Sequence, residues 1–323
     1  MFTLPSLTHT ASGAWRRAGF ELEFTGLTLQ RAAAVTRQTL GASTVREDAA
    51  SVRLAHAEFG EFTVEIDWEF LKRQAASQDA GAGGSWVDWL SQAAERLVPV
   101  EVVCPPLPLN RLDELLTPLG NALQAAGAAG TRDTVIAAYG VHINAEAPAD
   151  DADTLWRYLL SFALLQWWLV DRRGVDMARR ISPYVDLYPE SYLRELCAGP
   201  PKDRDTLLRQ YLAANPTRNR ALDLLPLLST FDAPAVQAAV DDPRVKARPA
   251  FHYRLPDCLI DEADWSLAEA WDGWRLIDDL AQRRDDLEAL AGAFLAAQRP
   301  LLGADRTEWT EQVGRWLHDR ALA

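Results

Sequence analysis

The sequence predicts an α+β protein built on a mainly antiparallel sheet with one apolar and one polar face. Three patterns lead to this fold class. The N-terminal half alternates short strand-like runs with turns and helices, the part after about residue 150 is mostly helical, and polar side chains keep one parity in each strand-like run. With 323 residues, 48% of them hydrophobic, the chain can bury a sizeable core.

Five segments are predicted to be strands because their apolar residues alternate, and residues i and i+2 of a strand share a face. These segments are Gly19–Thr25, Phe59–Phe70, Val100–Cys104, Val135–Glu146 and Phe251–Leu255. The opposite parity carries mostly carboxylates, with histidine, asparagine and one arginine. The polar residues expected on that second face include Glu21, Glu23, Glu61, Glu65, Asp67, Glu101, His142, Asn144, His252 and Arg254.

Helical periodicity predicts helices in both halves of the chain. Before residue 150 they are Leu27–Leu40, Ser85–Leu97 and Arg111–Ala126. After it they are Asp153–Arg172, Arg204–Ala214, Arg220–Leu228, Ala233–Val240, Asp264–Gln282, Asp285–Gln298 and a terminal helix from Glu308. Loops are predicted at Gln78–Ser85 and Pro105–Pro108.

Composition narrows the classes of partner and compartment. A net charge of −13 offers no basic face for phosphates, so nucleic acid is not an expected partner. Three widely spaced cysteines, Cys104, Cys197 and Cys258, favour a reducing, cytoplasmic location. The N-terminal residues lack a secretory signal pattern. The apolar run Tyr158–Val170 is too short to span a bilayer and is predicted to be a buried helix, so no membrane association is expected.

The carboxylates crowded on one face of the predicted sheet point to a function. Like charges placed together on one face repel each other by roughly 0.2–1 kcal/mol. A bound cation would neutralise them, and the alternative is a sheet with one solvated face. Oxygen ligands with a histidine favour Mg²⁺ or Mn²⁺ over zinc. Such ions commonly hold substrate phosphates too, and without a glycine-rich phosphate loop the nucleotide would have to be held by metal and arginine.

Several short motifs follow one another along the chain. Gly19–Phe24 reads G-F-E-L-E-F, the run from Val100 reads V-E-V-V-C-P-P-L, Tyr139–Asn144 reads Y-G-V-H-I-N, and Phe251–Arg254 reads F-H-Y-R. Val64–Trp68, with Asp67, and Thr217–Leu222 add two weaker segments. In this order they resemble the strand motifs and the Arg/Asn-bearing helix start of the amidoligase family, a branch of the glutamine-synthetase-like carboxylate–amine ligases.

That resemblance implies a roughly six-stranded sheet forming a polar funnel, with two or three Mg²⁺ ions that clamp ATP. It implies an amidoligase domain over residues 1–300 with a helical insertion at about 150–248, followed by a C-terminal helix over 301–323. An oligomer is compatible with the sequence. The substrates would be a carboxylate and an amine, small molecules or peptides, joined through an acyl phosphate.

The resemblance also implies roles for particular residues. The metal ligands would be Glu21, Glu23, Glu101, His142 and His252. Arg254 would contact the transferring phosphate, and Asn144 and Asn219 would help to bind the nucleotide. Glu65 and Asp67 would complete a metal site or assist catalysis, with Glu65 or Glu61 accepting the proton of the amine. For Asn219, the cap of a helix starting at Arg220 is a competing interpretation.

One residue departs from the family pattern: His252 stands where the E-x-R strand carries a metal-binding glutamate. This departure leaves two other hypotheses open. The chain could be a non-catalytic binding protein that keeps the fold. It could also be a phosphotransferase of the guanidino-kinase type, although such enzymes use several arginines and the predicted strands contain one.

Overall fold

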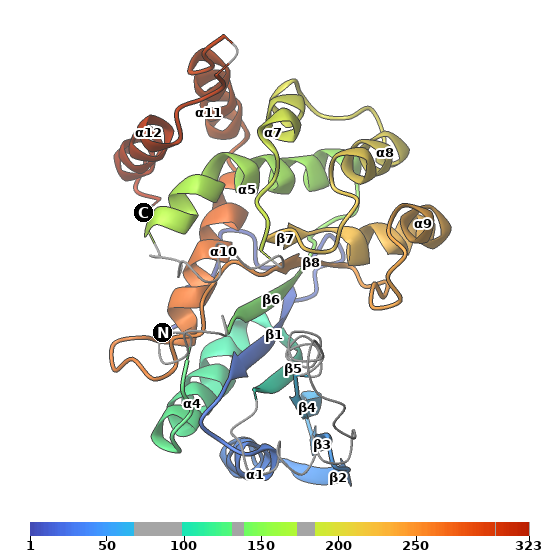
Figure 1. Ribbon diagram of the computed structural model, residues 1–323, viewed down its shortest axis with the longest axis vertical. Coiled ribbons are helices and arrows are strands. Elements are labelled where there is room, and N and C mark those ends of the chain that lie inside the picture. The colour runs from blue at the N-terminus through green and yellow to red at the C-terminus, as the bar shows by residue number, and fades with distance from the viewer. Residues whose placement is uncertain (68–98, 131–138, 173–184, 301, 323) are drawn as a thin grey trace, which may run out of the picture.

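A computed structural model describes residues 1–67, 99–130, 139–172, 185–300 and 302–322. The fold is α+β, as predicted. One eight-stranded antiparallel sheet has the order β2-β3-β4-β5-β1-β6-β8-β7. Helices pack along the sheet and gather beyond its β8–β7 end (Figure 1). The polar funnel remains a prediction, and so does the division at residue 300.

Five of the eight strands match the predicted ones, and β1 lies between β5 and β6. The strands are β1 (Arg17–Phe24), β2 (Ser43–Glu47), β3 (Ser51–His56), β4 (Gly60–Ile66), β5 (Val100–Pro108), β6 (Val141–Glu146), β7 (Leu222–Asp223) and β8 (Ala250–Tyr253). The sequence did not reveal β2, β3 and β7. All five residues of β2 are exposed, β3 buries only Val52 and Leu54, and β7 has two residues, so none shows a readable alternation.

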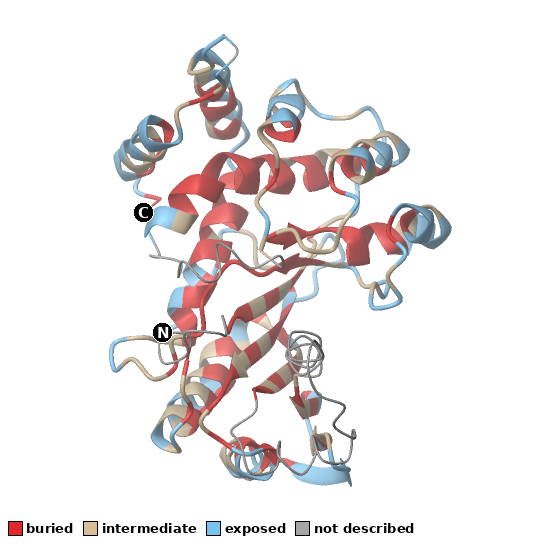
Figure 2. Ribbon diagram, viewed as in Figure 1, coloured by how far each residue is buried: buried red, intermediate tan, exposed pale blue. Residues whose placement is uncertain are grey.

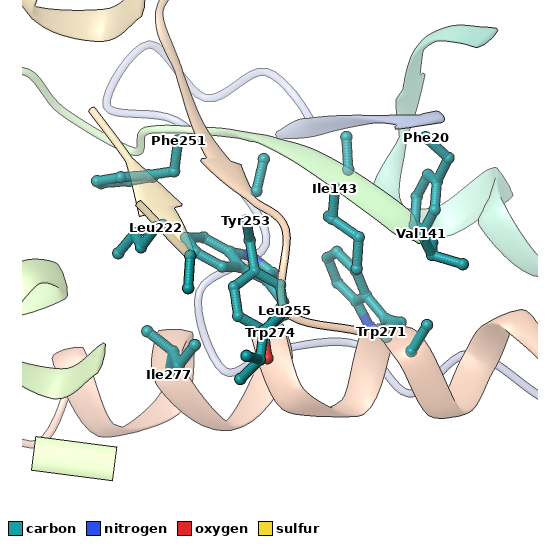
Figure 3. Close-up of a cluster of buried hydrophobic side chains, with 14 of the residues drawn as sticks. Phe20, Val141, Ile143, Leu222, Phe251, Tyr253, Leu255, Trp271, Trp274 and Ile277 are labelled. Atoms are coloured by element: carbon teal, nitrogen blue, oxygen red, sulfur yellow. The ribbon is translucent and has the colours of Figure 1, made fainter. Parts of the chain in front are cut away.

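Three helices cover the apolar face of the sheet. They are α1 (Leu29–Leu40), α4 (Leu112–Ala125) and α10 (Leu267–Ala281). Figure 3 shows Trp271 and Trp274 of α10 beneath the apolar side chains of β1, β6 and β8. The Trp274 ring centroid lies 5.3 Å from that of Phe251 and 5.9 Å from that of Tyr253. Because a slip of one residue would turn these apolar side chains to the other face, this core determines which residues face outward.

The helix α5 (Ala152–Arg172) runs through the centre of the helical half and is buried along most of its length (Figure 2). It packs against α10, α12 (Arg306–Asp319), α11 (Arg284–Ala296) and α7 (Glu190–Cys197). The predicted buried helix at Tyr158–Val170 is therefore confirmed. Among the helices that the structure describes, none combines the length and apolarity needed to cross a bilayer.

Several boundaries differ from the predictions. Residues Pro105–Pro108 continue β5 instead of forming a loop, and Leu107 and Pro108 lie opposite Ala18 and Arg17 of β1. The helix predicted from Arg220 was wrong at its start, because β7 comes first and α9 (Leu225–Ala239) follows it. A break at Asp232, with non-helical φ −148° and ψ 82°, divides α9 close to the predicted interruption.

The remaining helices are α8 (Arg204–Ala214), as predicted, and a short 3₁₀ turn, η1 (Leu109–Arg111). The periodicity did not reveal α7. The predicted helix Ser85–Leu97, the loop Gln78–Ser85 and the outer parts of the strands Phe59–Phe70 and Val135–Glu146 lie outside the described residues. The turn after β1 needs glycine, because Gly26 has φ 86° and a Cβ there would lie 2.3 Å from the carbonyl oxygen of Gly127.

Candidate metal and ligand site on the polar face of the sheet

The strand register brings the predicted polar residues side by side. Glu101 of β5 lies between its cross-strand partners Glu23 of β1 and Glu65 of β4. One step along the sheet, Glu21 lies opposite His142, and Asn144 lies opposite His252. The parity pattern in the sequence therefore predicted correctly which side chains share this face.

One group of residues centres on Glu21. Its Oε2 lies 3.0 Å from Nδ1 of His142 and 3.6 Å from Nε2 of His252. Its Oε1 accepts a hydrogen bond from the side-chain amide of Asn144 at 2.8 Å. Burial raises the pKa of Glu21, but its contacts with His252 and His142 outweigh burial and hold that pKa well below the usual carboxyl value. Glu21 is therefore ionised at neutral pH.

A second group joins Glu23, Glu101 and His142, whose potential ligand atoms all lie within 4.8 Å of one another. The Oε2 of Glu23 accepts the backbone N–H of Gly140 at 2.9 Å, and its Oε1 lies 3.7 Å from Nε2 of His142. His142 thus belongs to both groups and connects them.

Negative charge is concentrated around Glu101. Burial, together with the carboxylates of Glu21 and Glu23, raises the pKa of Glu101 well above its usual value. Burial and Glu21 also raise the pKa of Glu65. Asp67, just beyond β4, acts in the same direction on both. The opposite directions of these two shifts reflect the described neighbours, which are histidines at Glu21 and other carboxylates at Glu101.

Arg254, immediately after β8, lies beside the Glu21 group. Its Nη2 donates to Nδ1 of His252 at 2.9 Å and lies 3.3 Å from Oδ2 of Asp223 in β7. Burial and the neighbouring guanidinium lower the pKa of His252 to about 3, so this ring is neutral at physiological pH. Burial raises the pKa of Asp223 in spite of Arg254. Arg254 thus forms a buried ion pair with Asp223.

The sequence did not identify three basic residues and one acid at this end of the sheet. Arg248 lies 3.8 Å from Oε1 of Glu21 and donates to Asn144 at 3.4 Å. Burial and Arg254 lower the pKa of Arg218, which places two guanidinium groups close together. Lys246 counteracts the raised pKa of Glu65. Arg218 lies within the Thr217–Leu222 motif, and Asp223, the acid, directly follows it. That motif was the feature of the sequence from which both residues could have been predicted.

Asn219 does not join either group. Its backbone N–H bonds to Oγ1 of Thr217 at 3.1 Å, and its carbonyl oxygen accepts the N–H of Asp186 at 2.8 Å. Since no helix starts at Arg220, the helix-cap interpretation of Asn219 was also wrong. A separate cavity of about 850 Å³ lies between the C-terminal part of α5 and the start of α12, and none of the predicted site residues lines it.

The donor set fits a hard divalent cation. Carboxylate oxygens with an imidazole nitrogen are ligands that Mg²⁺ and Mn²⁺ accept. The buried Nε2 of His252, which lies at the Glu21 group, has no hydrogen-bond partner in the part of the chain that the structure describes. Guanidinium groups at one end and carboxylates at the other would suit a ligand that combines phosphate with metal.

Fold and site together define an α+β protein with a carboxylate–histidine site on one face of an antiparallel sheet, bordered by arginines. The family model described as "Putative amidoligase enzyme" matches residues 14–276, which is well over half of the chain. The chain belongs to this amidoligase family. A search of curated proteins and a search of solved structures gave no significant match.

Proposed function

We propose that this protein is an ATP-dependent carboxylate–amine ligase that forms an amide or peptide-like bond through an acyl phosphate. The observation that carries the proposal is the convergence of two carboxylate–histidine groups and Arg254 on one sheet face, in a chain of the amidoligase family. Membership of that family supports amide-bond formation. The dependence on ATP and metal is our inference from the site.

The chemistry requires an activated acid, because an amine cannot displace hydroxide from a carboxylate. Transfer of the γ-phosphate of ATP to the acid gives an acyl phosphate, and the amine then displaces phosphate. Mg²⁺ or Mn²⁺, held by residues of the two groups, would offset the repulsion between the anions. Arg254 and Arg248, which lie at the Glu21 group, would pair with phosphoryl oxygens, a role that suits planar guanidinium groups.

Of the two predicted proton acceptors, Glu65 is the better placed. Glu61 lies 3.5 Å from Arg53 and is about half exposed, so its charge is already paired at the surface. Glu65 lies opposite Glu101, and burial raises its pKa, which strengthens it as a base for the amine. Asp67 would support it from the end of β4.

Two alternatives retain support from particular contacts. The Arg254–His252 hydrogen bond ties up a nitrogen at the position where the family carries a glutamate, which favours a binding protein without turnover. Arg218 and Arg248 add guanidinium groups beside Arg254, and several arginines are what the guanidino-kinase type of phosphotransferase would need.

ADP release separates the three functions. With ATP and Mg²⁺, we expect ADP release in pools of carboxylates and amines to require both an acid and an amine for full turnover. The reason is that an acyl phosphate without an amine can only decay or remain bound. A coupled ADP assay over paired pools, with each pool alone as the control, measures this. Full turnover with one acceptor alone would support a phosphotransferase, and ATP binding without release in any pair would support a binding protein.

A further inference from the structure

The hydrogen bonds of His142 fix which of its ring nitrogens can bind a cation. Asn144 donates to Oε1 of Glu21 and the guanidinium of Arg248 lies beside it, so this carboxylate acts as an acceptor, and Nδ1 of His142, 3.0 Å from its Oε2, carries the proton. A histidine binds a metal ion through the nitrogen that carries no proton, which leaves Nε2, 3.7 Å from Oε1 of Glu23, as the nitrogen of His142 able to bind a cation. Two acceptors facing each other are unfavourable unless a cation lies between them. Ligand atoms each about 2.1 Å from one ion can be up to about 4.2 Å apart, so this spacing fits a shared ion.

The same reasoning gives the opposite result for His252. Arg254 has only donors, so Nδ1 of His252 accepts its hydrogen bond and the ring proton is on Nε2. That buried N–H lies 3.6 Å from Oε2 of Glu21 and has no hydrogen-bond partner among the residues that the structure describes. Both nitrogens of His252 are therefore committed to the protein, and neither offers a lone pair to a metal.

Glu21 is already surrounded by donors. Its two oxygens face the amide of Asn144, both histidine rings and the guanidinium of Arg248. Within the described ranges, the carboxylates of Glu23 and Glu101 have no such set of side-chain cations, and Glu65 adds a further carboxylate beside them. Among the described residues, hydrogen-bond donors and cations therefore offset the negative charge of Glu21, and no comparable set offsets the charge of Glu23 and Glu101.

We propose that the polar face binds one divalent cation, held by Glu23, Glu101 and Nε2 of His142, and that the contacts of His252 with Arg254 and with Glu21 position His142. Glu21 and His252, which the family pattern marks as ligands, would then orient a ligand instead of binding metal themselves, like the carboxylates behind metal-bound histidines. The proposal rests on the proposed function for its choice of a hard cation, Mg²⁺ or Mn²⁺.

Mn²⁺ binding tests the proposal without ATP, acid or amine, so a failure of the ligase assay would leave this test unaffected. Titration of the full chain with Mn²⁺, followed by electron paramagnetic resonance, should give one bound ion per chain. Pulsed measurements on that ion should show coupling to one histidine nitrogen. Two bound ions per chain, or no binding of Mn²⁺, would overturn the proposal.

Two matched pairs of variants identify the ligands. His142→Gln should remove the nitrogen coupling, and His252→Gln should keep it, because an amide can still accept from Arg254 and donate to Glu21. Glu23→Gln should abolish Mn²⁺ binding, whereas Glu21→Gln should weaken it by about 10–100-fold and keep one ion per chain. Loss of the coupling in His252→Gln would contradict the assignment.

The positioning role of His252 has its own readout. His252→Leu removes both contacts of the ring and should weaken Mn²⁺ binding by about tenfold or more while the nitrogen coupling remains. Far-UV circular dichroism and a thermal melt show whether each variant is folded. Equal Mn²⁺ affinity in the Leu and Gln variants would show that the contacts of His252 with Arg254 and Glu21 have no effect on the ion.

Discussion

Arg254→Ala is expected to reduce the trapping of an activated acid by hydroxylamine by about 10²–10³-fold. Hydroxylamine intercepts an acyl phosphate as a hydroxamate, and the carbonyl becomes electrophilic only after phosphoryl transfer. Trapping should therefore depend on ATP and Mg²⁺ and occur without the amine. The physical reason for the loss is that Arg254, held by Asp223 and His252, is a preorganised positive charge at the site. A colorimetric hydroxamate assay with an acid from the ADP screen measures the effect.

Removal of Arg254 also leaves Asp223 buried without its cation, so the folded fraction must be measured. Arg254→Lys is the matched variant, because it keeps the charge near Asp223 and loses the planar fork. We expect it to fold like the native protein and to restore trapping only in part. Hydroxamate that forms without ATP, or equal trapping in the native protein and Arg254→Ala, would exclude the acyl-phosphate mechanism.

Asp278→Ala is expected to lower the free energy of unfolding by about 3–5 kcal/mol. Arg16, just before β1, and Asp278 of α10 form a fully buried ion pair with a 2.6 Å Nη2–Oδ2 distance. The guanidinium of Arg16 also donates to the backbone carbonyls of Leu7 and Glu146. Loss of the carboxylate would leave its charge unpaired in the interior. Urea unfolding followed by tryptophan fluorescence measures the change.

The matched control is an ion pair of similar length at the surface. Arg204 and Asp150 approach to 2.7 Å, but both side chains are about half exposed or more. Asp150→Ala should change the free energy of unfolding by less than about 1 kcal/mol, because water already solvates both charges. A similar decrease in the free energy of unfolding in the two variants would mean that the buried pair between Arg16 and α10 stabilises the fold no more than a surface pair does.

The sequence predicted the part of the site that lies within strands. Glu21, Glu23, Glu101 and His142 stand in β1, β5 and β6, where apolar neighbours at alternate positions form the core and thereby orient them. Periodicity carries this information because the face of a residue depends only on its position along the strand. The identity of the partner across each pair came from the structure.

The remaining site residues depend on tertiary contacts that no local pattern encodes. Asp223 lies in a strand of two residues, too short for alternation, and is placed by pairing with His252 of β8. Arg248 stands in an irregular segment whose position is set by a hydrogen bond from its N–H to the carbonyl of Pro226. Prediction failed at these residues because long-range packing, and not local propensity, determines where their side chains lie.

The position of α5 has a consequence for biosynthesis. This helix leaves the ribosome before the partners α10, α11 and α12 that cover it, which lie about 100 residues or more further along the chain. The indole of Trp309 in α12, for example, donates to the carbonyl of Leu164 in α5 at 3.0 Å. Until those C-terminal residues emerge, the nascent chain carries an apolar helix without its native cover, the kind of surface that chaperones bind. A ribosome stalled before residue 300 would therefore present a chaperone substrate, whatever the state of the sheet.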